Sequence, residues 1–502
     1  MNLAFGLQSV PLPRASQPII IAVSGLYVAV VAAIAVWAAR RTRTSKDFFI
    51  AGGGIGVGTL AIAAMAATLS GFAFIGGPGL VYTLGFGALF IVLPASLTNT
   101  MCAWVLAKRM RLLGGARGLI TVPDAIGARY RSPAAQGLAG LAILVAIVGY
   151  MATNILALGL VLDAVFGSGL SLGIWLGAAV VLAYSAAGGM LAGVYTDVFQ
   201  GAVMAAASVL VFGYALATGG GLGGISTTIL AADPGFLGPW GKLTPLAALS
   251  FFFVFGLGAL GQPHVIHKFY MLKDPLRLKW YPLLMTAALL VTLLLFFGVG
   301  VAVKAEVLRG GMAPLARADD ATPQFLLRYT PGLLAGIVFA GVSAAIMSTV
   351  NSFLSVGAAA ITHDIPLALG YRMRNELRWG RISTVGLSLA AAVVAQLSGT
   401  LVAFLGIFGW GLFASTLVPS LAIGLNWAGA TRAGALASIA TGLVTTLAFE
   451  SVAYFKLYTF PAGVTVSGLS LVLSLLAFFG ISALTRHQAG DIDPDVVLVM
   501  ET

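Results

Sequence analysis

Four polar side chains in one apolar segment are the first residues of this sequence that could do chemistry. Ser348 and Thr349 are adjacent, and Asn351 and Ser352 follow them within SAAIMSTVNSFLS. Positions 345, 348, 349 and 352 share one face of a helix, because side chains three and four residues apart lie above one another. Aligned hydroxyl oxygens suit a small, hard cation. Ser and Thr also bond their own helix or a neighbouring one, so the pattern alone leaves both interpretations open.

Two titratable side chains also lie in apolar segments. Asp197 stands about one turn into the segment 191–217. A carboxylate inside a membrane is costly and usually functional, unless it caps a helix or pairs with Arg at the interface. His264 lies in a Gly-rich segment, where it could titrate near neutral pH or form a structural hydrogen bond. No Ser-His-Asp order, phosphate loop or metal-ligand spacing accompanies these residues, which argues against an enzyme.

The composition places these residues in a membrane protein. Of 502 residues, 59% are hydrophobic and 9% are charged, and the mean hydropathy is +1.01. Soluble domains contain about 45–50% apolar and about 25% charged residues, so both a soluble globule and a disordered chain are excluded. The 64 glycines suit helices that pack closely in a bilayer. The single cysteine, Cys102, excludes an intramolecular disulfide.

Apolar segments of about 20 residues are long enough to cross a bilayer as helices. About thirteen such spans are predicted, near 18–39, 55–82, 84–107, 136–162, 170–187, 191–217, 244–268, 281–304, 331–361, 381–398, 401–426, 432–450 and 462–485. The first is too long, and too firmly followed by Arg40, Arg41 and Arg43, to be a cleaved signal peptide. The predicted fold class is therefore an all-α integral membrane protein.

The basic residues predict the orientation of these helices. Of 27 Lys and Arg residues, 20 fall in alternate loops, such as those that follow spans one, three, seven and nine. Because Lys and Arg favour the cytoplasmic side, the N-terminus is expected outside and the C-terminus inside the plasma (inner) membrane of a bacterial-type cell. This distribution also accounts for the formal charge of +11 without a nucleic-acid partner.

Two of the predicted helices carry Gly and Pro at their centres. The second span contains Ser70-Gly71 and Gly76-Gly77-Pro78-Gly79, and the seventh contains Gly256, Gly258, Gly261 and Pro263. Small residues can simply allow close helix crossing. However, spans two to six and seven to eleven form two sets of five that run in opposite senses. Interrupted helices at matching places in inverted halves point to a transporter with a binding site at their interface.

This topology predicts five regions along the chain. Residues 1–53 form an external segment, an extra helix and a basic loop, and residues 54–217 form the first five-helix repeat. Residues 218–243 form an external loop, and residues 244–427 form the second repeat. Residues 428–502 form two further helices and a short cytoplasmic tail. Within the first repeat, 118–133 is predicted to contain a short interfacial helix with Pro123 and Asp124.

Five sequence blocks in order resemble the sodium:solute symporter family. They are SKDFFIAGGGIG, ATLSGFAFIGGPG, GGMLAGVYTDVFQG, GLGALGQPHVIHKFYMLKD and SAAIMSTVNSFLSVGAAAITHDI. The GQPH block is most similar to proline-type and monocarboxylate-type members. The resemblance implies a leucine-transporter-type fold, a 5+5 inverted repeat with one extra N-terminal and two extra C-terminal helices.

The same resemblance implies the cation ligands. A sodium ion would be bound by the backbone carbonyls of Ala66, Leu69 and Ala345 and the hydroxyls of Ser348 and Thr349. Some members hold a second cation beside a carboxylate that matches Asp197. Here that site, or a route for ion exit, would draw on Asp197, Ser348, Asn351 and Ser352. Asn351 replaces a Ser of those members, and Thr68 replaces an Asp of proline-type members.

The solute would lie beside the two breaks. The residues expected to contact it are Ser70, Phe72, Tyr150, Phe255, Ala259, Gln262 and His264. Proline-type members have Trp or Tyr where this chain has Phe72, Phe255 and Ala259, which argues against a simple proline transporter. An uncharged pocket favours a small monocarboxylate or amino acid.

The resulting prediction is sodium-coupled import of a small organic solute by alternating access, with sodium as coupling ion and no other cofactor. Two alternatives stay open. A proton could replace sodium by way of Asp197 or His264, or the chain could be a solute-sensing module that works with a separate signalling partner.

Overall fold

A computed structural model describes residues 17–398, 402–461, 463–489 and 492–501. Its regular secondary structure is helical. In these ranges strand-like pairing is limited to one isolated bridge between Ile55 and Leu272. The first ten helices are α1 (Gln17–Ala39), α2 (Ser45–Ile50), α3 (Val57–Thr68), α4 (Gly77–Leu84), α5 (Leu89–Cys102), α6 (Lys108–Arg117), α7 (Val122–Tyr130), α8 (Pro133–Phe166), α9 (Leu170–Thr218) and α10 (Gly221–Ala232). The others are α11 (Pro245–Gly258), α12 (Pro263–Ile266), α13 (Tyr281–Arg309), α14 (Ala321–Tyr329), α15 (Gly332–Ala359), α16 (Ile365–Ala368), α17 (Glu376–Ser398), α18 (Val402–Leu417), α19 (Arg432–Tyr454), α20 (Val466–Leu484) and α21 (Pro494–Met500).

Eleven helical segments among the described residues are long and apolar enough to cross a membrane, so the predicted count of thirteen is not confirmed. The predicted span 55–82 is cut at its break. Its first part, α3, is shorter than a span. Its second part, α4, is counted with α5 and α6 in the segment Phe72–Arg117, although the backbone at Gly85 between α4 and α5 is not helical (φ 61°, ψ −139°). The predicted span 170–187 becomes a shorter apolar stretch, Leu170–Ala183, at the start of the 49-residue helix α9.

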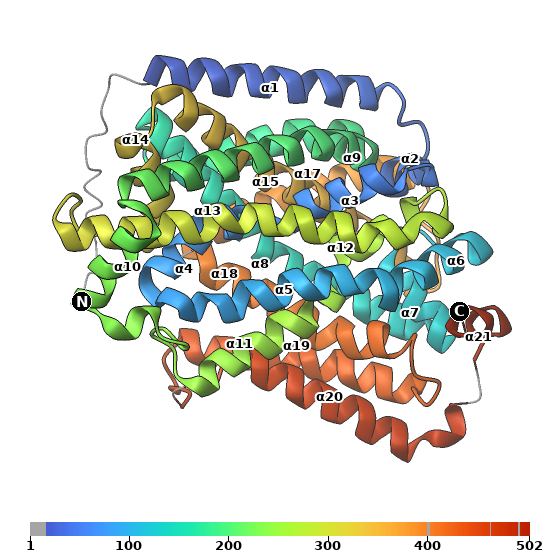
Figure 1. The fold of residues 1–502 in the computed structure, drawn as a ribbon. Helices are drawn as coiled ribbons and strands as arrows, with labels where there is room; N and C mark the ends of the chain where they lie inside the picture. Colours follow the sequence, from blue (N-terminus) through green and yellow to red (C-terminus); the bar gives the residue numbers. More distant parts are fainter. Residues whose placement is uncertain (1–16, 399–401, 462, 490–491, 502) are drawn as a thin grey trace.

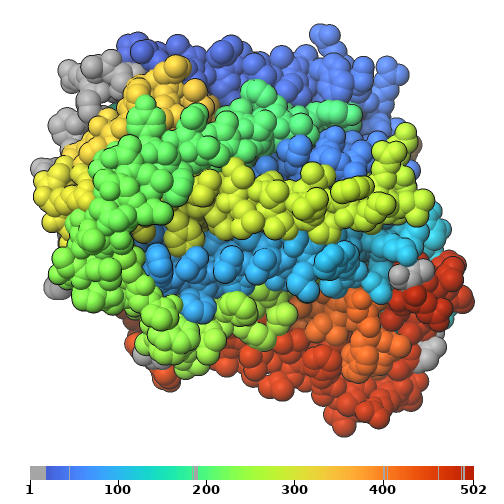
Figure 2. All heavy atoms as spheres, in the orientation of Figure 1, coloured from blue at the N-terminus to red at the C-terminus, as the bar shows by residue number. Residues whose placement is uncertain are grey.

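The long helices lie roughly parallel and form one bundle (Figure 1). The helices α8, α15 and α18 are the most buried, whereas α1 lies at the edge with Leu26 68% exposed. Figure 2 shows α1, α13 and α5 running across one face. Exposed apolar side chains such as Leu26, Trp104 and Leu284 suit contact with lipid. The helices α10 and α14 lie at one end of the bundle, here named the α14 end; α6, α7 and α21 lie at the opposite, α7 end.

Both predicted helix breaks are confirmed, and they have the same local form. The helix α3 ends at Leu69, whose backbone is extended (φ −83°, ψ 94°), before a π-helical turn leads into α4. The helix α11 passes through a tight turn to Gln262, which is also extended (φ −78°, ψ 102°), before α12 begins. The bridge between Ile55 and Leu272 holds the start of α3 beside the end of the second broken helix. The two broken helices therefore run in opposite directions.

The predicted helix within 118–133 is present as α7. A capping box begins it: Thr121 Oγ1 accepts from the Asp124 N–H (3.0 Å), and an Asp124 oxygen accepts from the Thr121 N–H (3.1 Å). The residues Pro123, Asp124, Arg129 and Tyr130 are buried. Arg129 is satisfied by carbonyls, including that of Gly424 at 2.7 Å. Because protein covers α7, it is part of the bundle.

Candidate functional site

The first break leaves backbone oxygens without helical donors. The Leu69 N–H makes the last regular bond of α3 (3.0 Å). The final four carbonyls of a helix lack an intrahelical donor, and here they include those of Ala66 and Leu69. The Ala67 carbonyl accepts instead from Thr349 Oγ1 on α15 (2.9 Å), which also lies 2.9 Å from the Ala345 carbonyl. The Thr349 hydroxyl therefore joins the break to α15.

The Ser348 hydroxyl lies next to this junction. It is fully buried beside the Asp197 carboxylate and makes no hydrogen bond of regular geometry among the described residues. A buried unpaired hydroxyl is costly, and a cation is one partner that would satisfy it. All five predicted sodium ligands thus lie around one contact between α3 and α15. They are Ala66, Leu69, Ala345, Ser348 and Thr349, and each is at most 5% exposed.

Asp197, the predicted carboxylate of a second cation site, forms a buried ion pair. Its Oδ2 lies 2.9 Å from Lys268 Nζ, and both side chains are 0% exposed. Lys268 is one of the basic residues that follow span seven, so a loop position is expected for it, and its burial corrects that expectation. The second broken helix continues through α12 into a helical turn, His267–Met271, which carries Lys268 inward to α9.

The other two residues predicted for a second cation, Asn351 and Ser352, are fully buried on α15. The Asn351 amide fills the space beside Gly193 on α9, where an added Cβ would lie 2.1 Å from Asn351 Nδ2. The Ser352 hydroxyl has no hydrogen-bond partner within the described part of the chain.

The polar residues of the first break are held by α8. Ser70 Oγ lies 3.4 Å from the Tyr150 hydroxyl and accepts from the Phe72 N–H (3.2 Å). The Gly71 N–H donates to Asn154 Oδ1 (2.9 Å), and the Asn154 amide donates to the Tyr150 carbonyl (2.9 Å). One polar network therefore positions Ser70, Phe72 and Tyr150, three of the predicted solute contacts.

Aromatic rings connect the two breaks. The rings of Phe72 and Phe255 stack with centroids 6.1 Å apart, and Trp410 on α18 stacks on Phe255 at 5.3 Å. Trp410 Nε1 is buried without a partner among the described residues. It faces Gly258, where a Cβ would lie 2.5 Å away. Ala259 is fully buried in the next turn.

The second break adds two more polar groups. Gln262 Nε2 donates to the Gly258 carbonyl (2.9 Å), while Gln262 Oε1 and His264 Nδ1 are buried without partners among the described residues. The His264 ring lies 4.3 Å from the Phe353 ring and 6.4 Å from that of Tyr150, between centroids. All seven predicted solute contacts are at most 9% exposed, so the region is closed to solvent at both ends.

Five participants were not predicted: the carbonyl of Ala67 and the side chains of Asn154, Lys268, Phe353 and Trp410. Asn154 had a usable signal, because an amide in the centre of an apolar span needs a partner. Trp410 stands beside two glycines in FGWGLF, which is a weaker sign of close packing. Lys268 and Phe353 had no such signal.

At the α14 end, the start of α14 contacts the first broken helix, and the residues just before it contact α18. Thr322 Oγ1 donates to the Phe74 carbonyl (2.8 Å), and Asp319 accepts from the Val402 N–H (2.8 Å) at the start of α18. Asp319 is 3% exposed. Burial raises its pKa to about 6, against the opposing effect of the Val402 hydrogen bond.

This pKa predicts how stability depends on pH. A carboxyl whose pKa is raised by folding favours the folded state at low pH, and that contribution is lost as pH rises through the folded pKa. Thermal stability in detergent should therefore increase between pH 7.5 and 5, by about 1.4 kcal/mol from this group. Asp319→Asn should stabilise the protein at pH 7.5 and flatten the profile. The control is Asp320→Asn, which removes a partly exposed ion pair with Arg317 (3.0 Å) and should leave the profile unchanged. An unaltered profile in Asp319→Asn would contradict the assignment.

At the α7 end, the segment 267–273 is tied to several elements. His267 Nε2 lies 2.8 Å from the Phe49 carbonyl, and Tyr270 donates to the Thr121 carbonyl (2.7 Å). The Lys273 N–H donates to the Ile55 carbonyl (2.8 Å). With the ion pair of Lys268, these contacts close the bundle below the second break.

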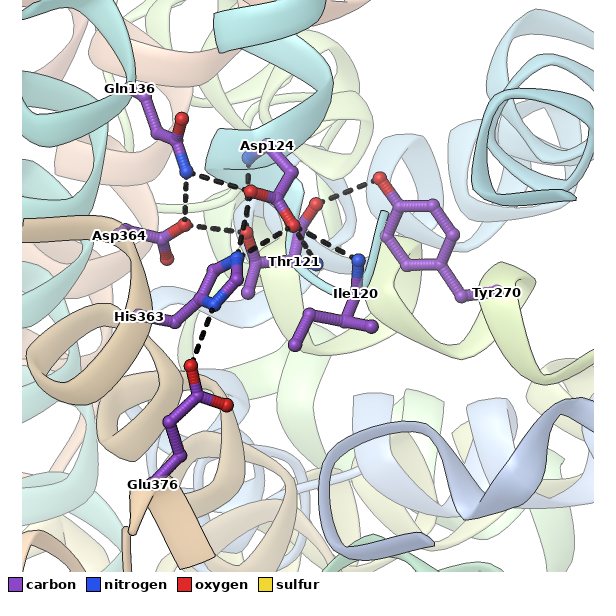
Figure 3. A network of polar contacts seen from close by, with 8 residues as sticks. All are labelled: Ile120, Thr121, Asp124, Gln136, Tyr270, His363, Asp364 and Glu376. Carbon is purple, nitrogen blue, oxygen red and sulfur yellow. Dashed lines mark hydrogen bonds and ion pairs between the residues drawn. The ribbon is translucent and has the colours of Figure 1, made fainter. Parts of the chain in front are cut away.

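A polar network lies behind Thr121 (Figure 3). His363 Nε2 lies 3.0 and 3.2 Å from the two Asp124 oxygens, and Thr121 Oγ1 donates to Asp364 (2.6 Å). Burial raises the pKa of Asp124, but the bond and charge of His363 outweigh it and hold that pKa below its ordinary value. Asp124, His363 and Asp364 each place one potential ligand atom within 4.8 Å of the other two. These atoms are close enough together to hold a metal ion. The sequence did not predict this grouping, since 239 residues separate Asp124 from His363.

Comparisons with known proteins identify the family and the fold. The model of the Sodium:solute symporter family matches residues 48–442. The osmoregulated proline transporter OpuE of Bacillus subtilis is 28% identical over 93% of this chain and 94% of its own length. The sodium/pantothenate symporter of Escherichia coli is 28% identical over 90% and 94%. A substrate-bound, outward-open Na+-coupled sialic acid symporter superposes with a TM-score of 0.76 at 19% identity, over 93% of this chain and 98% of that one. The fold is of the leucine-transporter type.

Proposed function

Because the chain belongs to the sodium:solute symporter family, and is therefore a sodium-coupled symporter, we propose that it imports a small monocarboxylate or amino acid together with sodium. The observation that supports this most directly is the junction at the first break. There the Thr349 hydroxyl contacts the Ala67 and Ala345 carbonyls beside the unpaired hydroxyl of Ser348. Carbonyl and hydroxyl oxygens are the ligands that a hard monovalent cation prefers.

We assign the ends of the molecule from its charges. The α7 end carries the basic loops, so it would face the cytoplasm and the α14 end would face outward. Sodium would bind from outside at Ala66, Leu69, Ala345, Ser348 and Thr349, and the halves 54–217 and 244–427 would then rock about the closed site. The segment 267–273 would open to release sodium and solute inside.

The solute class follows from the groups around the two breaks. An indole N–H (Trp410), a phenol (Tyr150) and the free polar atoms of Gln262 and His264 lie among the aromatic rings at the two breaks, and no acidic, Lys or Arg side chain is among them. Such groups can bind one carboxylate by hydrogen bonds while the stacked rings cover an apolar body. The named relatives transport proline and pantothenate, and each of these solutes carries a carboxylate.

A thermal-shift screen of purified protein tests the proposal. Small monocarboxylates and amino acids are added with sodium or with choline, and a true ligand at about 100 times its Kd should stabilise the protein by about 2.7 kcal/mol. We expect hits that require sodium. Uptake by proteoliposomes under a sodium gradient then measures transport.

The other outcomes separate the alternatives. Uptake that follows a pH gradient without sodium would favour proton coupling. Asp197 would then be a poor proton carrier, because it is paired with Lys268. His264 would be the remaining candidate for carrying the proton. Ligand binding without any uptake would favour the sensing module.

A further inference from the structure

The buried pair of Asp197 and Lys268 has a feature that the proposed sodium site does not explain. Lys268 Nζ contacts one carboxylate oxygen, Oδ2, at 2.9 Å. The other oxygen, Oδ1, is buried without a hydrogen-bond partner in the described structure. Charges this deep in a membrane protein require a countercharge, because desolvation penalises each alone. Lys268 supplies that countercharge here.

The helix α15 carries two hydroxyls on one face, and the first of them lies beside this carboxylate. The Ser348 hydroxyl lies beside Asp197, and the Ser352 hydroxyl follows one turn later on the same face of α15. Neither has a partner with hydrogen-bond geometry among the described residues. A carboxylate oxygen and two hydroxyls form a donor set that suits a monovalent cation. The positive charge beside them is already provided by the chain.

We infer that the Lys268 ammonium takes the place of a second sodium ion beside Asp197, and that Lys268 thereby limits the protein to one sodium per transport cycle. The inference rests on the proposed function. An ammonium and a sodium ion carry the same charge, so either one neutralises Asp197. A sodium ion added beside the ammonium would place two positive charges against one carboxylate, and their repulsion in a low-dielectric interior would exclude it. Lys268 is thus a positioning residue that sets stoichiometry.

The test replaces Lys268 with methionine, which keeps the length of the side chain and removes its charge. We expect purified wild-type protein to bind about one sodium ion, with a Hill coefficient of about 1 in radiolabelled sodium binding. Lys268→Met should bind about two, with a Hill coefficient approaching 2. Its thermal stability should fall in choline and recover in sodium, because sodium then neutralises Asp197.

Three variants keep the result interpretable. Lys268→Arg retains a positive charge, and Asp197→Asn with Lys268→Met removes both charges, so each should bind about one sodium. The double variant also remains informative if Lys268→Met does not fold. Lys304→Met makes the same chemical change at the α14 end, where Lys304 lies over Tyr82 and Phe236, and should also bind about one.

Several results would overturn the inference. The inference is wrong if wild-type protein binds two sodium ions, if Lys268→Met binds one, or if the double variant binds two. Wild-type protein that shows no sodium binding and no sodium-dependent uptake would instead remove the proposed function itself, and with it this inference.

Discussion

Replacing Ser348 and Thr349 together with alanine is expected to raise the sodium concentration for half-maximal uptake at least tenfold. In the proposed site both hydroxyls are sodium ligands. Interactions of this kind with a charged group contribute about 1.5–3 kcal/mol each, and a tenfold change corresponds to about 1.4 kcal/mol. Thr349 also bridges the Ala67 and Ala345 carbonyls. Initial rates of uptake by proteoliposomes, measured over a range of sodium concentrations, give the result.

Two controls separate lost ligands from lost packing. Thr349→Ser keeps the hydroxyl and should stay close to the wild type. Ser208→Ala removes a fully buried hydroxyl that donates to the Met204 carbonyl of its own helix (2.9 Å), so sodium dependence should not change. A double alanine variant with unaltered sodium dependence would disprove the assignment of these ligands.

Gly71→Ala should reduce the initial uptake rate by about tenfold or more. The added Cβ would lie 2.6 Å from Ala157 Cβ and 3.1 Å from the Ile346 side chain. Neither α8 nor α15 can yield easily, and overpacking of this kind costs about 1–3 kcal/mol. The first break must therefore shift, and Leu69 and Ser70 would shift with it. Misplacement by about 1 Å is enough to cost a large factor in rate.

Matched variants test this explanation. Gly58→Ala lies on the same helix, α3, with nothing within 4 Å of the added Cβ, so uptake should be unchanged and stability slightly higher. Ala157→Gly combined with Gly71→Ala restores the missing space and should recover part of the rate. If Gly71→Ala transports normally, the close contact with α8 does not position the break.

The sequence predicts features that depend on local pattern. Apolar length, basic loops and Gly-Pro clusters were sufficient for the membrane class, the spans and both breaks. The number of spans was not confirmed, because α3 ends at Leu69 and is shorter than a span, and α4 is counted with α5 and α6 in one segment although the backbone at Gly85 is not helical (φ 61°, ψ −139°). The burial of α7 was also missed, since a capping box marks where a helix begins and not what covers it.

The side-chain pairings depend on tertiary geometry and could not be predicted. Lys268 follows an apolar span and looks like a loop residue until the broken helix is seen to carry it to Asp197. Asp124 and His363 are far apart in the chain, and their contact requires α7 to lie against the end of α15. Ligand positions on one helix could be predicted, because helical spacing relates them. Examples are Ala345, Ser348 and Thr349.

The matching backbone angles of Leu69 and Gln262 have a consequence for how such a molecule can work. The two breaks are similar joints in helices that run in opposite directions. For each conformation in which one half is bent and the other is straight, there is a second conformation in which the two halves exchange roles. The second conformation opens to the opposite side of the membrane. In the proposed alternating-access cycle, loading and unloading can therefore use the same kind of joint, which the chain contains twice.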